Sequence, residues 1–320
     1  MSGPRILDPA HPEVLRAAVG VLRTGGVVAI PTETVYGLAG LTTHPAAIEH
    51  IYALKRRPSG NPLIAHVSGI DDVHALIAPG SWNDKADQLA HHFWPGPLTL
   101  ILPKAKSVPS IATGGRDSIA IRCPSHPVAR MLCAEVGEAL SAPSANRSGA
   151  VSPTCAAHVA DEFSDSHLMI LDGGSAEIGL ESTVLDVRDP EHLRILRPGS
   201  ITREDLESVV GSVEVISTTV QGDSPGTLSS HYAPRTPVHV VESAQSVGPH
   251  DVFVRFASDG AASGCRLDIH LGTDVEKASH RLYAALREAD AVGAERICIE
   301  QPPAGPEWVA ILDRVQRASI

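Results

Sequence analysis

The sequence predicts a protein of two α/β domains, and three observations lead to this fold class. Short apolar runs typical of buried strands, such as residues 27–30 and 63–67, alternate irregularly with segments whose apolar residues have helical spacing. Because the alternation is not strict, a twisted mixed α/β sheet fits better than a regular doubly wound one. The alternation of predicted strands and helices fades after about residue 210 and restarts near residue 236. We therefore expect a first domain at 1–210, a linker at 211–235 and a second domain at 236–320.

The elements of the first domain follow from local patterns. Ser152 and Pro153 predict a helix start, with Ser152 as the N-cap, and Thr202 predicts the cap of another helix. The other predicted helices end at glycines, prolines or a change of spacing. The predicted helices are 15–22, 45–56, 83–93, 128–136 and 203–210, and the predicted strands are 27–30, 63–67, 98–102, 118–122, 168–171, 183–187 and 193–196.

The second domain shows the same kinds of segment on a smaller scale, over about 85 residues. Leucines and alanines line one face of its first helix, and Trp308 with later aliphatic residues lines one face of its second. The predicted strands are 238–241, 252–256 and 296–300, and the predicted helices are 278–289 and 307–316.

Composition excludes several function classes. The formal net charge of −11 and the aromatic content of 3% argue against a general nucleic-acid binder, which needs many cations and stacking platforms. The five cysteines are scattered and form no C-x-x-C pair, so we expect reduced thiols and no thiolate metal site. No run approaches the roughly 18 apolar residues of a membrane span. We expect a soluble, cytoplasmic protein.

Two polar loops beside predicted strands are the strongest candidates for a ligand site. Pro-Thr-Glu-Thr-Val-Tyr-Gly at 31–37 offers hydroxyls and a carboxylate, and Lys-Arg-Arg-Pro-Ser-Gly-Asn-Pro at 55–62 offers three cations and an amide. Together they suit a small zwitterion next to a polyphosphate. Two interpretations of Lys55 and Arg57 stay open at this point. They are either cations at a helix end, which the helix dipole favours, or a phosphate clamp.

Further candidates have weaker signals. The small polar loop 141–149 runs toward Ser152, which indicates an anion site or an ordinary capped surface loop. Arg122 ends a predicted strand and is either a carboxylate ligand or a paired surface cation. His66 lies within a strand and is either a ligand or a core histidine. Common nucleotide motifs such as G-x-x-x-x-G-K-[ST] and G-x-G-x-x-G are absent from the sequence.

Taken in order, the motifs resemble the threonylcarbamoyl-adenylate synthase family in its longer, two-domain form. They are PTETVYGL, K-x-RP with NPL-x-x-H, WPGPLTL, S-x-A-x-R-x-P, SAPSAN-x-SG with SPT, ESTV and LRPG. The resemblance covers nearly the whole chain. It implies a YrdC-like first domain with a small Rossmann-like α/β second domain. It also implies the conversion of ATP, L-threonine and bicarbonate to threonylcarbamoyl-AMP and pyrophosphate, the first step of t6A modification of tRNA.

The resemblance assigns roles to particular residues. It implies that Lys55 and Arg57 clamp the ATP phosphates as catalytic residues. Threonine would be held by Thr34, His66, Arg122, Ala142 and Ser182, and ATP by Arg57, Asn61, Ser118, Ser144, Ser152, Arg197 and Tyr232. The protein would supply no metal ligands, because Mg²⁺ would arrive on the phosphates. The product would pass to tRNA threonylcarbamoyl-transferase proteins, and direct tRNA binding is not expected to be strong.

The linker departs from the family pattern, and two rival functions remain. Relatives of this form carry cations where this chain has Thr227-Leu-Ser-Ser230, which weakens a phosphate contact there but leaves a lid role for the linker. One rival is a module that binds RNA directly. The other is a carbamoyl-transferring maturation enzyme on the same fold, which normally carries zinc-finger cysteine pairs that this chain lacks.

Overall fold

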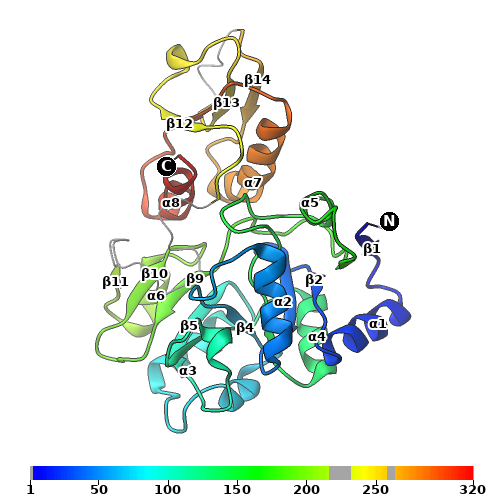
Figure 1. Ribbon diagram of the computed structural model, residues 1–320. Helices are drawn as coiled ribbons and strands as arrows, with labels where there is room; N and C mark the ends of the chain where they lie inside the picture. Colours follow the sequence, from blue (N-terminus) through cyan, green and yellow to red (C-terminus); the bar gives the residue numbers. More distant parts are fainter. Residues whose placement is uncertain (1–2, 216–231, 258–263, 320) are drawn as a thin grey trace.

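The computed structural model describes residues 3–215, 232–257 and 264–319, which form a larger first domain and a smaller second one (Figure 1). The strands of the first domain are β1 (Arg5–Leu7), β2 (Val28–Ile30), β3 (Gly37–Leu41), β4 (Ile64–His66), β5 (Leu98–Pro103), β6 (Ser118–Arg122), β7 (Leu140–Ser141), β8 (Met169–Leu171), β9 (Thr183–Asp186), β10 (Arg194–Arg197) and β11 (Glu214–Val215). Its α-helices are α1 (Pro12–Arg23), α2 (Pro45–Lys55), α3 (Asp84–Phe93), α4 (Pro127–Val136), α5 (Ala156–Glu162) and α6 (Arg203–Val210).

In the described residues these strands form one 11-stranded sheet in the order β1-β8-β2-β3-β7-β4-β6-β5-β9-β10-β11. Pairs such as β4 with β6 and β5 with β9 are parallel, whereas β5 with β6 and β9 with β10 are antiparallel. The predicted fold class, a mixed sheet rather than a doubly wound one, is therefore confirmed. Within the described residues, no helix has the length and apolar character that a membrane span requires.

The second domain is a four-stranded parallel sheet with helices, in the order β12-β15-β13-β14. Its strands are β12 (Val238–Val241), β13 (Val252–Arg255), β14 (Leu267–His270) and β15 (Ile297–Glu300), and its α-helices are α7 (Val275–Ala291) and α8 (Val309–Ala318). The sequence did not predict β14, which has only four residues and two half-buried positions. The lid that the sequence predicts within the linker falls largely on 216–231, outside the described residues.

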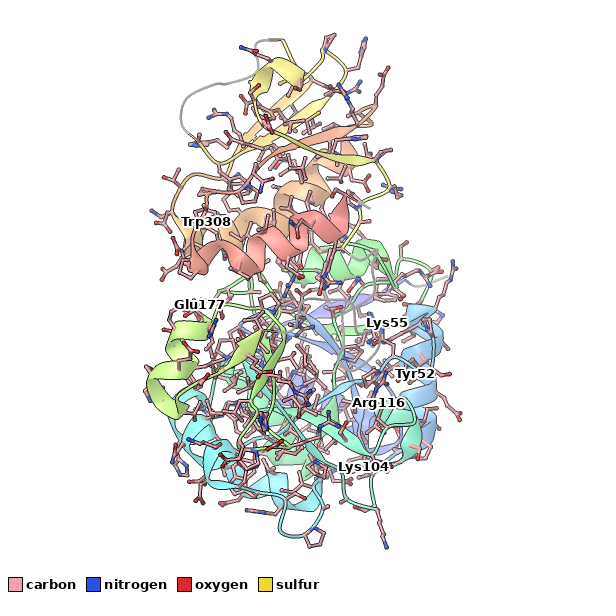
Figure 2. The ribbon with its side chains drawn as sticks, turned by 90° about the vertical axis from the view of Figure 1, so that its left-hand side faces the viewer. Tyr52, Lys55, Lys104, Arg116, Glu177 and Trp308 are labelled. Atoms are coloured by element: carbon pink, nitrogen blue, oxygen red, sulfur yellow. The ribbon has the colours of Figure 1, made fainter. Side chains whose placement is uncertain are left out.

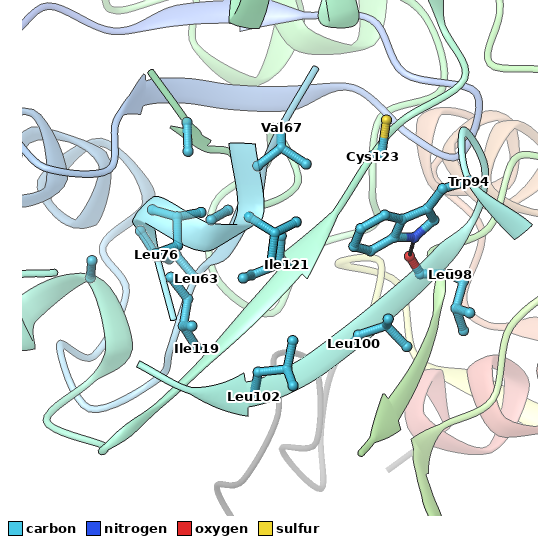
Figure 3. Close-up of a cluster of buried hydrophobic side chains, with 14 of the residues drawn as sticks. Leu63, Val67, Leu76, Trp94, Leu98, Leu100, Leu102, Ile119, Ile121 and Cys123 are labelled. Atoms are coloured by element: carbon cyan, nitrogen blue, oxygen red, sulfur yellow. Dashed lines mark hydrogen bonds between the residues drawn. The ribbon is translucent and has the colours of Figure 1, made fainter. Parts of the chain in front are cut away.

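The main core covers one face of the large sheet. On the other face, α1 and α4 pack against β2, β3 and β7 in a second apolar cluster, and a small apolar cluster at β4, β5, β6 and β9 lies among polar strand residues. Leu98, Leu100 and Leu102 of β5 pack with Ile119 and Ile121 of β6 on the core face (Figure 3). Because side chains alternate along a strand, the intervening residues of both strands point to the opposite face. That opposite face carries the polar strand residues considered below.

One local prediction is confirmed and another is wrong. Thr202 caps α6 in a capping box, in which its hydroxyl accepts from Asp205 N at 3.1 Å and the Asp205 carboxylate accepts from Thr202 N at 2.9 Å. Ser152, in contrast, is not an N-cap, because α5 begins at Ala156. Its hydroxyl donates instead to Glu181 at 2.6 Å, so a tertiary contact overrides the local helix-start pattern.

The two domains share a buried apolar cluster and a close backbone contact. Val35, Val151 and Leu180 of the first domain pack with residues of α7 and α8, and Figure 2 shows α7 and α8 against the top of the first domain. Gly179 has φ +80, and a Cβ there would lie 2.7 Å from His280 Cα and 2.7 Å from Ser279 O of α7. The junction therefore has no room for a side chain at position 179.

Replacing Gly179 by alanine tests how tightly the domains pack. Gly179→Ala should lower the stability by about 1–3 kcal/mol more than Gly174→Ala, because overpacking adds to the backbone strain. Gly174 is a matched control, since it has φ +83 and nothing within 4 Å of the added Cβ. Urea denaturation of both variants gives the comparison. Equal losses would contradict a closely packed junction.

Candidate active site

A pocket lies on the face of the large sheet opposite the main core, between the strand ends and the second domain. Its wall comes from the loop after β2, the ends of β4, β6 and β7, the segment before β9 and the end of β10. The lining residues are Thr32, Thr34, Val35, Tyr36, Gly37, Arg57, Ile64, His66, Arg122, Ala142, Pro143, Ser144, Glu181, Ser182, Arg197 and Tyr232. The pocket is partly open to solvent, and its inner cavity volume is about 40 Å³.

Arg122 is the central cation of one side of the pocket. Parallel pairing of β4 with β6 sets it beside His66, and its side chain is almost fully buried. Its Nη2 lies 2.7 Å from Glu33 Oε1, and its Nη1 donates to Thr34 Oγ1 at 2.8 Å. Burial raises the pKa of Glu33, but the Arg122 charge and hydrogen bond outweigh burial and hold that pKa below its usual value. The pair fixes a charged guanidinium at the pocket wall.

His66 is neutral in this setting. Burial, reinforced by the nearby Arg122 charge, lowers its pKa to about 3. Its Nδ1 lies 3.2 Å from the carbonyl oxygen of Ile64. A neutral imidazole beside a cation can serve a ligand as a hydrogen-bond partner without adding charge.

Ser182 and Arg197 form a second polar corner. The Ser182 hydroxyl lies 2.8 Å from Thr99 Oγ1, and Arg197 donates to the Ser182 carbonyl oxygen at 3.0 and 3.1 Å. Gly199 makes this approach possible, because a Cβ there would lie 2.3 Å from Thr183 N. Arg197, the last residue of β10, is thereby held against the residue that precedes β9.

The two cations at the end of α2 have different surroundings. Arg57 lines the pocket, where it donates to Pro62 O at 3.1 Å and Asn61 O at 3.3 Å; burial lowers its pKa to about 10, so it remains charged at neutral pH. Lys55 Nζ donates to Ser144 O and Asn146 O, each at 2.5 Å, and the side chain does not line the pocket. Lys55 thus supports the loop that carries Ser144. Figure 2 shows Lys55 in the first domain, with Tyr52 and Arg116 on the same side.

The structure brings together most of the residues that the sequence singled out. Thr34, Arg57, His66, Arg122, Ala142, Ser144, Ser182, Arg197 and Tyr232 line the pocket. Lys55, Asn61, Ser118 and Ser152 do not line it. Of these, Ser152 donates a hydrogen bond to the pocket residue Glu181. The Asn61 carbonyl oxygen accepts a hydrogen bond from the pocket residue Arg57.

Glu181 is the pocket residue that sequence reasoning missed. It is 6% exposed and accepts hydrogen bonds from Ser152 Oγ, Tyr283 OH and Arg314 Nε at 2.6, 2.8 and 2.9 Å. Burial raises its pKa, but the Arg314 and Arg197 charges lower it more, to about 2. The signal available in the sequence was a glutamate directly before Ser182. Two of its three partners, Tyr283 and Arg314, lie in the second domain, so the local pattern could not reveal its role.

Tyr232, near the end of the linker, completes the wall. It has φ 63, an uncommon conformation for a residue other than glycine, and it is 1% exposed. Its ring stacks on Tyr283 with centroids 5.6 Å apart, and Arg314 Cζ lies 5.1 Å from its centroid. The pocket wall therefore depends on contacts with the second domain.

Comparison with known proteins identifies the family. Residues 20–199 match a family model described as "Telomere recombination", and residues 201–319 match one described as "Threonylcarbamoyl-AMP synthase, C-terminal domain". The first match covers the domain that holds the pocket, and the second covers the C-terminal domain, so the chain is an enzyme of two domains. The chain belongs to the threonylcarbamoyl-AMP synthase family, in the two-domain form.

Individual relatives agree with this membership over nearly the full length. The chain is 38% identical to threonylcarbamoyl-AMP synthase of Pyrococcus abyssi, over 95% of this chain and 94% of the relative. It is 37% identical to the Bacillus subtilis enzyme of that name, over 98% and 94%. A crystal structure of P. abyssi Sua5 complexed with L-threonine aligns with a TM-score of 0.91 and 34% identity, over 99% and 98% of the two chains.

The neutral state of His66 predicts an acid-side loss of stability. The unfolded chain protonates this imidazole below about pH 6.5, whereas the folded chain resists protonation down to about pH 3. Stability is therefore present above pH 6.5 and falls as the pH drops, by up to about 1.4 kcal/mol per pH unit.

Urea unfolding between pH 7 and pH 4.5 measures this effect. The stability difference between wild type and His66→Asn should shrink as the pH falls. His50→Asn, at an exposed position of α2, is the control and should follow the wild-type profile. A constant difference between wild type and His66→Asn would contradict the neutral assignment.

Proposed function

We propose that the protein condenses ATP, L-threonine and bicarbonate into threonylcarbamoyl-AMP and pyrophosphate. The observation that carries the proposal is one pocket lined by the buried cations Arg57, Arg122 and Arg197, in a chain that aligns almost end to end with a threonine-bound relative. The family membership supports an enzyme of this class. The rival of a direct RNA binder lacks comparable support, given the net charge of −11.

We assign threonine to the corner around Arg122. The guanidinium would bind the threonine carboxylate, while Thr34 and Ser182 offer hydroxyls to the amine and the side-chain hydroxyl. Neutral His66 would add a hydrogen bond without repelling the substrate ammonium group. Ala142 contributes main chain to the same wall. The side chains of this corner are all buried.

We assign ATP to the side of the pocket that holds Arg57, Ser144 and Arg197. Both arginines keep a positive charge at neutral pH and could neutralise the phosphates and the leaving pyrophosphate. Lys55 would act by holding the Ser144 loop, and the direct phosphate contact of Lys55 stays a prediction. Asn61, Ser118, Ser152 and Tyr232 keep their predicted places in the nucleotide site as part of this proposal.

The reaction needs positioning and charge stabilisation more than a protein nucleophile. The threonine amine would form a C–N bond with the bicarbonate carbon, releasing water and leaving a carbamate. A carbamate oxygen would then attack the α-phosphorus of ATP, and the bond to the β-phosphate oxygen would break. Two negative groups must approach each other in this second step. The buried arginines lower that cost because they are fixed in place beforehand.

Magnesium would enter on the phosphates of ATP. The described residues contain no cluster of three His, Cys, Asp or Glu side chains that could hold a metal, and Glu181 is engaged by Arg314. We therefore assign no residue of this chain to the metal. Bound Mg²⁺ would supply charge neutralisation at the departing pyrophosphate.

The product would serve tRNA modification in the cytoplasm. A mixed anhydride of a carbamate and AMP is prone to hydrolysis, so we expect its transfer to downstream threonylcarbamoyl-transferase proteins that modify tRNA. All five cysteines are free thiols, which suits a reducing compartment.

The direct test is pyrophosphate release from ATP by the purified chain. We expect release only when both L-threonine and bicarbonate are present, together with an adenylate detected by mass spectrometry. Pyrophosphate release that does not depend on threonine would contradict the proposed reaction. A lack of pyrophosphate release under every combination of substrates would also contradict it.

Arg57 offers a matched pair of variants. Arg57→Ala should lower kcat/KM for pyrophosphate release on the order of 100-fold, because it removes one fixed positive charge from the pocket. Arg56→Ala removes the same charge from the neighbouring exposed position and should leave kcat/KM near the wild-type value. Similar turnover in the two variants would rule out the phosphate role of Arg57.

A further inference from the structure

The second domain contributes buried hydrogen-bond donors to a carboxylate of the pocket. Arg314 of α8 and Tyr283 of α7 both reach Glu181 Oε2, at 2.9 and 2.8 Å. Neither donor lines the pocket, and both side chains are fully buried. Glu181 Oε1 meanwhile accepts from Ser152 at 2.6 Å. One carboxylate therefore links the second domain to a residue predicted to bind ATP.

Arg314 holds a second segment of the pocket wall at the same time. Its Nη2 donates to Pro198 O at 3.0 Å, directly after Arg197. Its Nη1 lies 2.5 Å from Asp313 Oδ2, and its guanidinium lies against the Tyr232 ring. A planar group with several donors can make all these contacts at once, which an ammonium group cannot.

The two segments held by Arg314 carry residues assigned to both substrates. Glu181 precedes Ser182 on the threonine side, and Pro198 follows Arg197 on the ATP side. Arg197 also donates to the Ser182 carbonyl oxygen, so the segments are joined beneath the pocket. A shift of Arg314 must therefore move both substrate corners together.

The position of this ion pair argues for a role beyond holding the domains together. Apolar contacts already bury the junction, and a buried ion pair is a weaker source of stability than apolar packing of the same volume. Here the pair lies at the pocket wall and carries hydrogen bonds in fixed directions. Directional contacts are what a preorganised site requires.

We propose that Arg314, assisted by Tyr283, is a positioning residue that acts from the second domain. It fixes the positions of Glu181 and Pro198. Through these two residues it positions the neighbouring site residues of the first domain, which are Ser152, Ser182 and Arg197. The inference rests on the proposed function. It gives the second domain a defined part in the reaction, although none of that domain's described residues lines the pocket.

Arg314→Lys and Tyr283→Phe test the role while keeping charge or shape. Arg314→Lys keeps a cation on Glu181 but loses the simultaneous Pro198 contact, and Tyr283→Phe loses only the hydroxyl. We expect the KM for ATP and for threonine to rise together, by about tenfold in Arg314→Lys and less in Tyr283→Phe, with a smaller change in kcat. Arg255→Lys is the matched control, because Arg255 pairs with Asp268 at 2.8 Å within the second domain.

Melting temperature and threonine binding by calorimetry accompany the kinetics. Wild-type KM values in Arg314→Lys, or an equal effect of Arg255→Lys, would overturn the positioning role. If the variants lose activity only to the extent that their melting temperatures fall, and their KM values are unchanged, the positioning role is also overturned.

Calorimetry separates this inference from the proposed reaction. If the wild type binds threonine but releases no pyrophosphate, the proposed function fails. A threonine Kd raised about tenfold in Arg314→Lys would then still support positioning, and an unchanged Kd would overturn it. A wild type that neither binds threonine nor releases pyrophosphate contradicts both.

Discussion

The site depends on keeping three arginines charged while they are buried close together. Arg57, Arg122 and Arg197 are each less than 10% exposed, and burial without partners would be costly. The chain meets this cost with a carboxylate for Arg122 and main-chain carbonyl oxygens for Arg57 and Arg197. Carbonyl oxygens satisfy the donors without cancelling the charge. The positive charge therefore stays available to anionic substrates.

The same constraint explains why the pocket needs the second domain. Glu181 is a buried anion among these cations, and its charge is balanced by Arg314 from α8. Arg197 is the other cation whose charge lowers the pKa of Glu181, so Arg314 shares with it the balancing of this carboxylate. If Glu181 had to rely on Arg197 alone, its charge would draw more strongly on Arg197. Arg197 would then lose part of its attraction for phosphate. The interdomain ion pair thus protects the charge pattern of the pocket as well as its shape.

The sequence predicted the parts of the fold that depend on neighbouring residues. The strand at 118–122 and the helix at 203–210 appear with those bounds, since alternation and a capping box are local signals. Ser152 shows where this reasoning stops. Its pattern indicates an N-cap, but its partner Glu181 is 29 residues away and is itself fixed by Arg314, 133 residues further. Contacts of that separation leave no trace in a local pattern.

Two kinds of support hold the pocket wall. β4 and β6 lie inside the sheet with partners on both sides, so His66 and Arg122 form a rigid floor. Tyr232 lies outside any helix or strand and holds a positive φ, which costs about 1 kcal/mol or more for such a residue. Stacking on Tyr283 and the Arg314 contact offset that cost. The second domain therefore holds the part of the pocket wall that no strand of the large sheet fixes.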